Sequence, residues 1–438
     1  MVNITTTPNI IFNPCPAALD ADDNNDATMS NGEYSWTPLQ RTVVLTTFLW
    51  GYSITKIVGG RIAEVLGGWE TMGCCLTVSG LLSLLCPAAS YLHPLALAGV
   101  RLLMGLIQGP VFPALYSVLA SWSLPEELAT MISVAYSGRA LGSLVGVAGS
   151  GWVVKSLGWR WVFWGCGVLA LTWAPLWFIF VRNFPYEHPF ISDREKRLLS
   201  LIHVHPKRRV PWTRVAMGTT IYLLMLVETG NMWVHNMFVN ETPTFYIYKI
   251  GMSLETSRWV RMGWSGVSWV FCFLYGMISD LIVHYRFLSR VNTRRFMHLI
   301  GMMLVVTGLV GVMWSGCRTD FVVGFMMFPA LGVTTTSVTY QLTPMDIAPN
   351  YAGTLVGLVG LGNLVGFVAP ITTILFNSQP NGWDAIIFFS CCLYLVFSLF
   401  YVVGVTADVQ DWNFYEEIDG DEEQPAVSET PRPRPAAL

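Results

Sequence analysis

Two polar side chains interrupt the apolar stretch between about residues 95 and 121. Arg101 lies about six residues into this stretch, and Gln108 follows seven residues later. Seven residues are close to two helical turns, so both side chains would lie on one helix face. A guanidinium keeps its charge and binds carboxylate or phosphate through paired hydrogen bonds. We therefore predict that Arg101 and Gln108 bind an anionic solute. The alternative is a structural arginine bonded to a neighbouring carbonyl.

A second polar group lies in the apolar stretch 215–239, where Glu228, Asn231 and His235 are spaced at i, i+3 and i+7. A carboxyl group deep in lipid is poorly solvated, which favours its neutral form and suits proton exchange. A nearby imidazole can pass a proton on. We therefore predict that Glu228 and His235 couple solute movement to H⁺ or Na⁺ and that Asn231 contacts the solute. The alternative is a network of satisfied polar groups that packs helices together.

Two further cations interrupt apolar stretches. Arg139 follows Gly138, and Gly142 and Gly146 continue a small-residue face that is typical of close helix packing. Arg139 is interpreted as a second anion contact or as a side chain that reaches the membrane surface. Lys56 lies one turn from the end of its stretch, and we interpret it as reaching the surface in this way.

The composition indicates which solvent surrounds these residues. Hydrophobic residues make up 53% of the 438 residues and charged residues only 12%, whereas about 25% of a soluble protein is charged. This excludes an ordinary soluble enzyme or a disordered scaffold and predicts a lipid bilayer as partner. The net charge of −3 does not favour nucleic acid. The sequence has no Gly-rich phosphate loop, zinc-hydrolase motif or nucleophile elbow, so we expect no cofactor, no metal and no enzymatic activity.

Apolar stretches of about 20 residues are long enough to cross a bilayer as helices. They predict an all-α polytopic membrane protein with eleven spans, at about 42–60, 71–91, 95–121, 131–154, 161–181, 215–239, 259–283, 297–315, 321–342, 352–376 and 384–406. Lys and Arg are concentrated in the connections 182–214 and 284–296, which predicts that this side is cytoplasmic. The C-terminus is then cytoplasmic, and residues 1–41 form an extracytoplasmic segment. Residues 407–438 are acidic and proline-rich and are predicted to be a disordered cytoplasmic tail.

Three short motifs recur at a nearly constant offset. The offset is 216 positions between residues 60 and 276 and between residues 112 and 328, and 220 between residues 141 and 361. This predicts two parallel copies of a helical bundle, 42–181 with five spans and 215–406 with six, joined by the cytoplasmic central loop 182–214. The first span of the second copy has its counterpart near residues −1 to 23, which are polar and proline-rich. One of twelve helices is therefore expected to be absent, either by truncation or in an unusual eleven-span form.

Specific motifs extend over residues 42–412. They are Phe48–Tyr52, Gly59-Gly60, Arg101–Gly109, Phe112–Ala114, Gly158-Trp159, His188–Ser192 and Asp346–Gly353. Their combination resembles the solute-carrier 17 family of the major facilitator superfamily, which includes sialin, vesicular glutamate and nucleotide transporters and sodium/phosphate cotransporters. The resemblance implies the major-facilitator fold of two pseudo-repeated bundles, and it implies that the missing helix reflects truncation.

The resemblance also implies roles for individual residues. Arg101 stands at the position of the family's substrate-binding arginine. Gln108 stands where several members have a proton-coupling glutamate, and glutamine resembles the nucleotide-transporting branch; an amide takes up no proton at physiological pH. Glu64 and Asp280 occupy the acidic position of the loop motif that locks the two halves, so both are predicted to be gating residues.

We therefore expect a secondary active transporter, a symporter of small organic anions or inorganic phosphate. It would alternate access between two bundles and be driven by a proton gradient, a sodium gradient or membrane potential. The expected location is the plasma membrane or a vesicular or lysosomal membrane. Two alternatives are a truncated relative that does not transport and an integral-membrane enzyme that uses His235 and Glu228.

Overall fold

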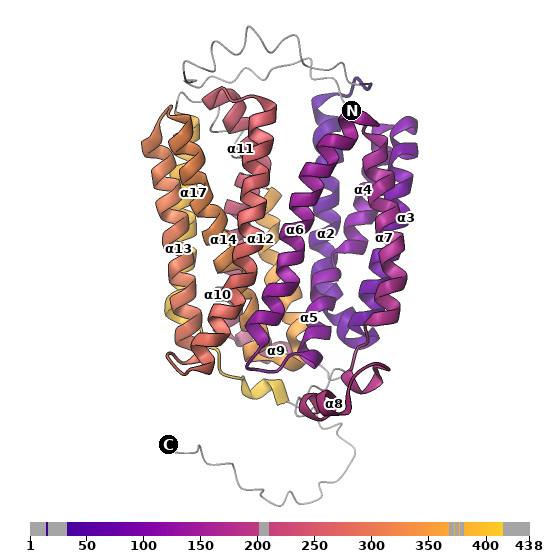
Figure 1. Cartoon of the computed structure of the whole chain (residues 1–438), viewed down its shortest axis with the longest axis vertical. Coiled ribbons are helices and arrows are strands. Elements are labelled where there is room, and N and C mark those ends of the chain that lie inside the picture. The colour runs from indigo at the N-terminus through magenta and orange to yellow at the C-terminus, as the bar shows by residue number, and fades with distance from the viewer. Residues whose placement is uncertain are drawn as a thin grey trace, which may run out of the picture.

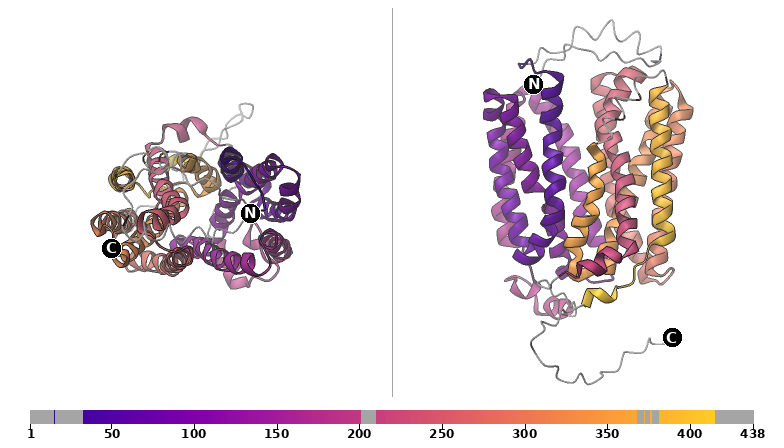
Figure 2. Two further views of the ribbon diagram at one scale, coloured as in Figure 1. Left: turned by 90° about the horizontal axis from the view of Figure 1, so that it is seen from above. Right: turned by 180° about the vertical axis from the view of Figure 1, so that it is seen from behind.

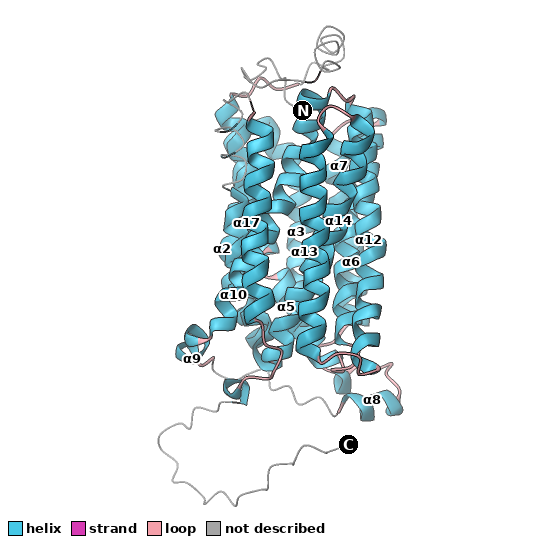
Figure 3. Ribbon diagram, turned by 90° about the vertical axis from the view of Figure 1, so that its left-hand side faces the viewer, coloured by secondary structure: helices cyan, strands magenta, loops and turns pink. Residues whose placement is uncertain are grey.

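The computed structural model describes residues 15, 33–200, 210–367, 372, 376 and 381–414. Long helices lie side by side in two bundles, with the connections at the two ends (Figures 1, 2 and 3). The first bundle consists of α2 (Pro38–Leu66), α3 (Gly68–Leu92), α4 (Pro94–Gln108), α5 (Val111–Trp122), α6 (Leu128–Ser156) and α7 (Arg160–Phe180). The second consists of α10 (Thr219–Asn236), α12 (Leu254–His284), α13 (Arg290–Ser315), α14 (Thr319–Ile347), α15 (Ala352–Val359) with the 3₁₀ helix η5 (Gly360–Phe367), and α17 (Gly382–Gly404).

Short helices connect these elements. In the chain segment that joins the two bundles, three short helices follow one another: η1 (Pro185–Glu187), α8 (Asp193–Leu199) and α9 (Trp212–Met217). The chain after α10 continues through η2 (Met237–Glu241), α11 (Thr242–Thr244) and η3 (Phe245–Ile250), and η4 (Pro349–Tyr351) and η6 (Asp411–Phe414) follow α14 and α17. We call the end of the molecule that carries α8 the lower end and the opposite end the upper end (Figure 1).

Nine helices within the described ranges are long and apolar enough to cross a membrane, with α4 and α5 counted as one. They correspond to nine of the eleven predicted spans. The predicted span 215–239 is α10, which has 18 residues and continues into the π-helical η2. The predicted span 352–376 changes from α15 to η5 after residue 359, and most of its last part lies outside the described residues. Of the predicted disordered tail 407–438, residues 407–414 are described and ordered, because they form η6 and bury Trp412 and Asn413 against the second bundle. The residues from 415 onward lie outside the described residues.

Several helices extend beyond the apolar stretches because polar residues cap them. The Thr37 hydroxyl accepts from the Gln40 backbone N–H, and the Gln40 side chain accepts from the Thr37 N–H, so α2 begins four residues before the predicted span. Ser289 caps α13 in a similar way, so α13 begins seven residues before the predicted span. Each cap satisfies backbone donors that the first helical turn leaves free. Hydropathy detects the membrane-crossing part of a helix and not these polar ends.

The two copies of the repeat differ in how one glycine-rich face is covered. In the second copy, a Cβ atom at Gly362 would lie 2.7 Å from Cγ of Glu228 on α10. In the first copy, a Cβ atom at Gly138, Gly142 or Gly146 would meet no described atom within 4 Å. The predicted close packing of this α6 face is therefore wrong for the described residues. The reason is that the described part of the first bundle has no helix in the place that α10 takes in the second.

A disulfide joins the N-terminal segment to the second bundle at the upper end. Cys15 is bonded to Cys317, which lies between α13 and α14. Cys15 is only 2% exposed, and its backbone N–H donates to the Lys249 carbonyl at 2.9 Å. A residue that precedes the first bundle is thus built into the core of the second.

We expect the double substitution Cys15→Ser and Cys317→Ser to lower the temperature of unfolding in detergent. The bond closes a separation of 302 residues, and a disulfide of this kind stabilises a protein by about 2–4 kcal/mol. The measurement is thermal unfolding with and without reductant, with Cys392→Ser as the control because Cys392 is a free, exposed cysteine. Equal unfolding temperatures for the oxidised protein and the double variant would contradict this prediction.

Candidate functional site

A cavity of about 150 Å³ lies between the two bundles, and we call it the central cavity. It is lined by α6 of the first bundle and by α10, α12 and α14 of the second. Its basic lining residues are Arg139, His235 and Arg261, and Tyr136 lines it as well. Four serine hydroxyls add polar groups, those of Ser143, Ser265, Ser268 and Ser337. Among the residues that the structure describes, no Asp or Glu lines it. The central cavity is therefore positively charged and rich in hydrogen-bond donors.

Helices α6 and α12 run antiparallel and set the spacing of the two arginines. The hydroxyls of Ser143 and Ser265 are 3.3 Å apart across the bundle interface. Arg139 lies four residues below Ser143 on α6, and Arg261 lies four residues above Ser265 on α12. At 1.5 Å per residue, the two backbone positions are separated by roughly 12 Å along the helix axes. The central cavity thus has one cation towards its upper side and one towards its lower side.

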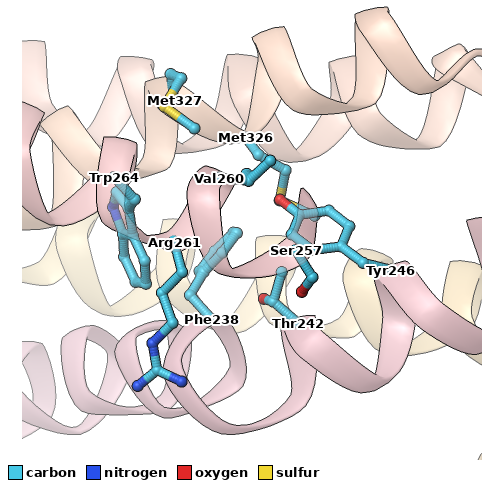
Figure 4. A pocket seen from close by; sticks show the side chains of 9 residues that line it. All are labelled: Phe238, Thr242, Tyr246, Ser257, Val260, Arg261, Trp264, Met326 and Met327. Carbon is cyan, nitrogen blue, oxygen red and sulfur yellow. The ribbon is translucent and has the colours of Figure 1, made fainter. Parts of the chain in front are cut away.

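Neither guanidinium in the central cavity is neutralised by a described carboxylate. The salt bridges of the described residues involve other cations: Lys56, Arg61, Arg160 and Arg294. Arg139 instead lies over the ring of Tyr136, 5.8 Å from the ring centroid. Arg261 lies beside Trp264, and its guanidinium points away from the small apolar pocket around Tyr246 and Met326 (Figure 4). Two uncompensated guanidinium groups make a site for carboxylate or phosphate groups.

Arg101 and Gln108 lie elsewhere in the first bundle. Gln108 lines a separate cavity of about 290 Å³, together with Tyr52 and Ser83, and its amide donates to Ser79. Arg101 lies over the ring of Phe163 at 5.7 Å, and its buried Nε has no hydrogen-bond partner among the described residues. It lines neither cavity. The structure therefore does not bring Arg101 together with Arg139, and the role of Arg101 stays a prediction.

The polar stripe of α10 is divided among three environments. His235 lines the central cavity. Asn231 is fully buried, donates to the Thr336 hydroxyl at 2.7 Å and accepts from Ser337 at 3.1 Å, which corresponds to the packing alternative. Glu228 is 1% exposed and pairs with Lys56 of the other bundle, with 3.5 Å between Nζ and Oε1. Only His235 thus faces the central cavity.

The interpretation of Lys56 as a surface-seeking side chain is wrong, because the Lys56 side chain is only 6% exposed. The second bundle packs on α2 at this level, and a Cβ atom at Gly360 would lie 2.4 Å from Cδ of Lys56. Distance from a helix end predicts access to the membrane surface only when lipid or water surrounds the side chain, and here another bundle does.

Arg261 was not predicted as a site residue. It lies near the end of the span 259–283, where an arginine ordinarily reaches the membrane surface. The sequence nevertheless contains an indication of its role. Arg258 and Arg261 are two cations near the upper side, where the other connections are poor in Lys and Arg, so their presence there is unusual.

The predicted gating residues form two matching contacts between the bundles at the lower end. Glu64, near the end of α2, accepts from the backbone N–H of Thr354 at 2.7 Å and from its hydroxyl at 2.6 Å. Asp280, near the end of α12, accepts from the backbone N–H groups of Ala129 at 3.2 Å and Thr130 at 2.7 Å. Each carboxylate thus caps the first turn of a helix in the opposite bundle, α15 or α6, where negative charge is stabilising.

Comparison with known proteins identifies the class to which this fold and cavity belong. Residues 17–370 match the profile of the Major Facilitator Superfamily, so the chain belongs to this superfamily of membrane transporters. Human sialin is 26% identical over 387 residues, which are 87% of this chain and 78% of sialin. Human vesicular glutamate transporter 2 is 25% identical over 402 residues, 88% of this chain and 68% of the relative. These transporters, which are not enzymes, confirm the resemblance to the solute-carrier 17 family.

Two further comparisons agree. A Drosophila melanogaster protein described as a candidate inorganic phosphate cotransporter is 25% identical over 434 residues, 95% of this chain and 80% of that protein. The crystal structure of the human organic anion transporter MFSD10 superposes with a TM-score of 0.61 at 15% identity, covering 88% of this chain and 89% of that one. The Escherichia coli fucose:proton symporter FucP gives a TM-score of 0.59 at 12% identity, covering 88% and 95%. At these identities the two structures confirm the fold.

Proposed function

We propose that the protein is a secondary active transporter of small organic anions or inorganic phosphate, and that the central cavity is its binding site. The observation that carries this proposal is the pair Arg139 and Arg261, which face the central cavity without a described carboxylate partner. A solute with a carboxylate or phosphate group supplies the missing negative charge. The names of sialin, the vesicular glutamate transporter and the candidate phosphate cotransporter support anionic solutes.

Alternating access follows from the position of the central cavity between two bundles. The Glu64 and Asp280 contacts hold the lower ends together. Movement of a solute to the other side therefore requires these contacts to break while the bundles rock about the cavity. We assign Glu64 and Asp280 to this gate.

The integral-membrane enzyme is the weaker alternative. It needs His235 and Glu228 as neighbouring catalytic groups, but His235 lines the central cavity whereas Glu228 is paired with Lys56 and does not line it. The two side chains therefore do not converge on one reacting centre.

We also propose that the lower end faces the cytoplasm, in the plasma membrane or in a vesicular or lysosomal membrane. The basic connections 182–214 and 284–296 support this orientation. The Cys15–Cys317 disulfide at the upper end supports it independently, because disulfides persist in oxidising, extracytoplasmic compartments.

The test of the proposed function is uptake by the full-length protein in proteoliposomes. The panel contains phosphate, glutamate, sialic acid, urate and a nucleotide, with glucose as a neutral solute, under imposed proton, sodium and voltage gradients. We expect saturable uptake of at least one anion and none of glucose. If correctly folded protein moves none of the anions under any gradient, a relative that does not transport is the better description.

A further inference from the structure

The ion pair between Lys56 and Glu228 is buried and joins the two bundles. Lys56 belongs to α2 and Glu228 to α10, their charged atoms are 3.5 Å apart, and the side chains are 6% and 1% exposed. The second buried ion pair of the described residues, Arg294 with Asp346 at 3.0 Å, lies entirely within the second bundle. Rocking of the bundles can therefore separate Lys56 from Glu228 but leaves Arg294 and Asp346 together.

Polar atoms without hydrogen-bond partners surround this inter-bundle pair. Gln341 Nε2 donates to Glu228 Oε2 at 3.2 Å, and Glu228 Oε1 is the atom paired with Lys56. Glu228 Oε1 and three further buried oxygens make no hydrogen bond among the described residues; the three are Gln341 Oε1, Tyr116 Oη and Tyr340 Oη. The charged and titratable groups that interact electrostatically with Glu228 are Lys56 of α2, Tyr116 of α5, Tyr136 of α6 and Tyr340 of α14. Lys56 is the only cation of this set, so the charge of Glu228 depends on Lys56 for its compensation.

The central cavity gives Glu228 a connection to the transport site. Tyr136 lines the central cavity and interacts electrostatically with Glu228. His235 lies two helical turns from Glu228 on α10 and lines the same cavity. A proton that enters the central cavity thus has titratable side chains between it and the carboxylate.

Separating the pair while both groups are charged leaves a carboxylate on one bundle and an ammonium on the other. Breaking a buried ion pair in this way is strongly unfavourable. A proton on Glu228 removes the negative charge and with it most of the attraction to Lys56, so this pair no longer holds the two bundles together. Glu228 must release its proton before the pair can form again.

We propose that Glu228 is the proton-binding site of the transport cycle and that Lys56, on the other bundle, is the cation that compensates its negative charge. A proton taken from the central cavity neutralises Glu228 and releases Lys56, and the carboxyl group returns that proton to the cytoplasmic side once the lower ends have opened. Because the Lys56 ammonium lies against the carboxylate where a sodium ion would bind, the geometry points to H⁺ as the coupling ion. This inference rests on the proposed function for its place in a transport cycle.

The experiment measures opening of the lower end directly, without any solute. Ser133 on α6 is fully buried against Gly276 of α12, so Ser133→Cys reports separation of the bundles there. The full-length protein carries this cysteine in a background in which the free cysteines are serines and the disulfide is kept. The rate of maleimide labelling is compared at about pH 7.5 and about pH 5.5, and each rate is divided by the rate for the same cysteine in the denatured protein at that pH. This division is needed because maleimide reacts with the thiolate, whose fraction falls about 100-fold over this range.

We expect acid to raise the normalised labelling rate about tenfold when Glu228 is present. The variant Glu228→Gln should show the high normalised rate at both pH values, because an amide is neutral throughout. Asp346→Asn is the matched control, because it breaks a buried ion pair within one bundle and should keep the acid response. The double variant Lys56→Gln with Glu228→Gln leaves no unpaired charge at this position. If Glu228→Gln alone misfolds, the double variant tests whether the acid response is lost when Glu228 is neutral.

Two results would overturn the inference: an acid response that persists in well-folded Glu228→Gln, or a normalised labelling rate of the parent protein that does not depend on pH. Failure of the proposed function is distinguishable, because it would appear as absent anion uptake in proteoliposomes while the pH-dependent labelling remained.

Discussion

Replacing Arg139 with alanine is expected to lower anion uptake into proteoliposomes by roughly 10- to 100-fold. A hydrogen bond to a charged group contributes about 1.5–3 kcal/mol, and each 1.4 kcal/mol changes an equilibrium constant tenfold. The Arg139 guanidinium has no described carboxylate partner that would reduce this contribution. The same change at Arg261 should act in the same direction, and the double variant should abolish measurable uptake.

The control for this prediction is Arg160→Ala. Arg160 is paired with Glu33 at 2.6 Å outside the central cavity, so its charge is already compensated and uptake should change little. Arg139→Lys should keep part of the activity, because lysine retains the charge but not the paired donors.

Arg101→Ala tests the alternative that Arg101 is the main anion contact. A larger loss of uptake than for Arg139→Ala would favour Arg101 as that contact. Unchanged uptake in both Arg139→Ala and Arg261→Ala would contradict the assignment of the central cavity.

The second large effect is expected when both inter-bundle caps are removed. Glu64→Gln combined with Asp280→Asn should shift the protein from closed to open at the lower end by at least about tenfold. Each carboxylate accepts two hydrogen bonds from the opposite bundle, and bonds to charged groups contribute about 1.5–3 kcal/mol. An interaction made in only one of two states shifts their populations by its full free energy.

This shift can be measured as a distance between spin labels at Glu126 and Phe287. Both residues are exposed and lie in lower-end connections of different bundles. We expect the double variant to populate longer distances than the parent protein. Glu187→Gln serves as the control, because Glu187 is acidic and exposed at the lower end but caps no helix of the other bundle. Identical distance distributions for parent and double variant would remove Glu64 and Asp280 from the gate.

Most of the fold could be predicted from the sequence because a bilayer imposes a simple rule. A helix that crosses about 30 Å of hydrocarbon needs about 20 apolar residues, so nine of the eleven predicted spans appear as helices of the required length. The remaining two are α10, with its π-helical end, and the segment that changes from α15 to η5. Both contain polar or glycine-rich sequence that the second bundle accommodates, and hydropathy does not describe such packing.

The candidate site could be predicted only in part. Arg139 and His235 could be found as polar residues within apolar stretches, and both line the central cavity. Lys56 and Arg261 could not be separated from ordinary residues near helix ends, because the same position suits a lysine or arginine that reaches the membrane surface. Glu228 was recognised as a buried acid, but its partner lies 172 positions earlier in the chain, between residues 56 and 228, on the other bundle.

The amino-acid sequence by itself determined the lipid environment, the duplicated bundle and the acidic residues that recur at the lower end, because hydropathy and internal repetition are properties of order along the chain. Only the tertiary structure decided which charges meet. It paired Lys56 with Glu228, left Arg139 and Arg261 without a described carboxylate partner, and set Arg101 against Phe163. The physical reason is that compensation of a buried charge depends on distances of a few ångströms between helices, and these follow from how the two bundles pack.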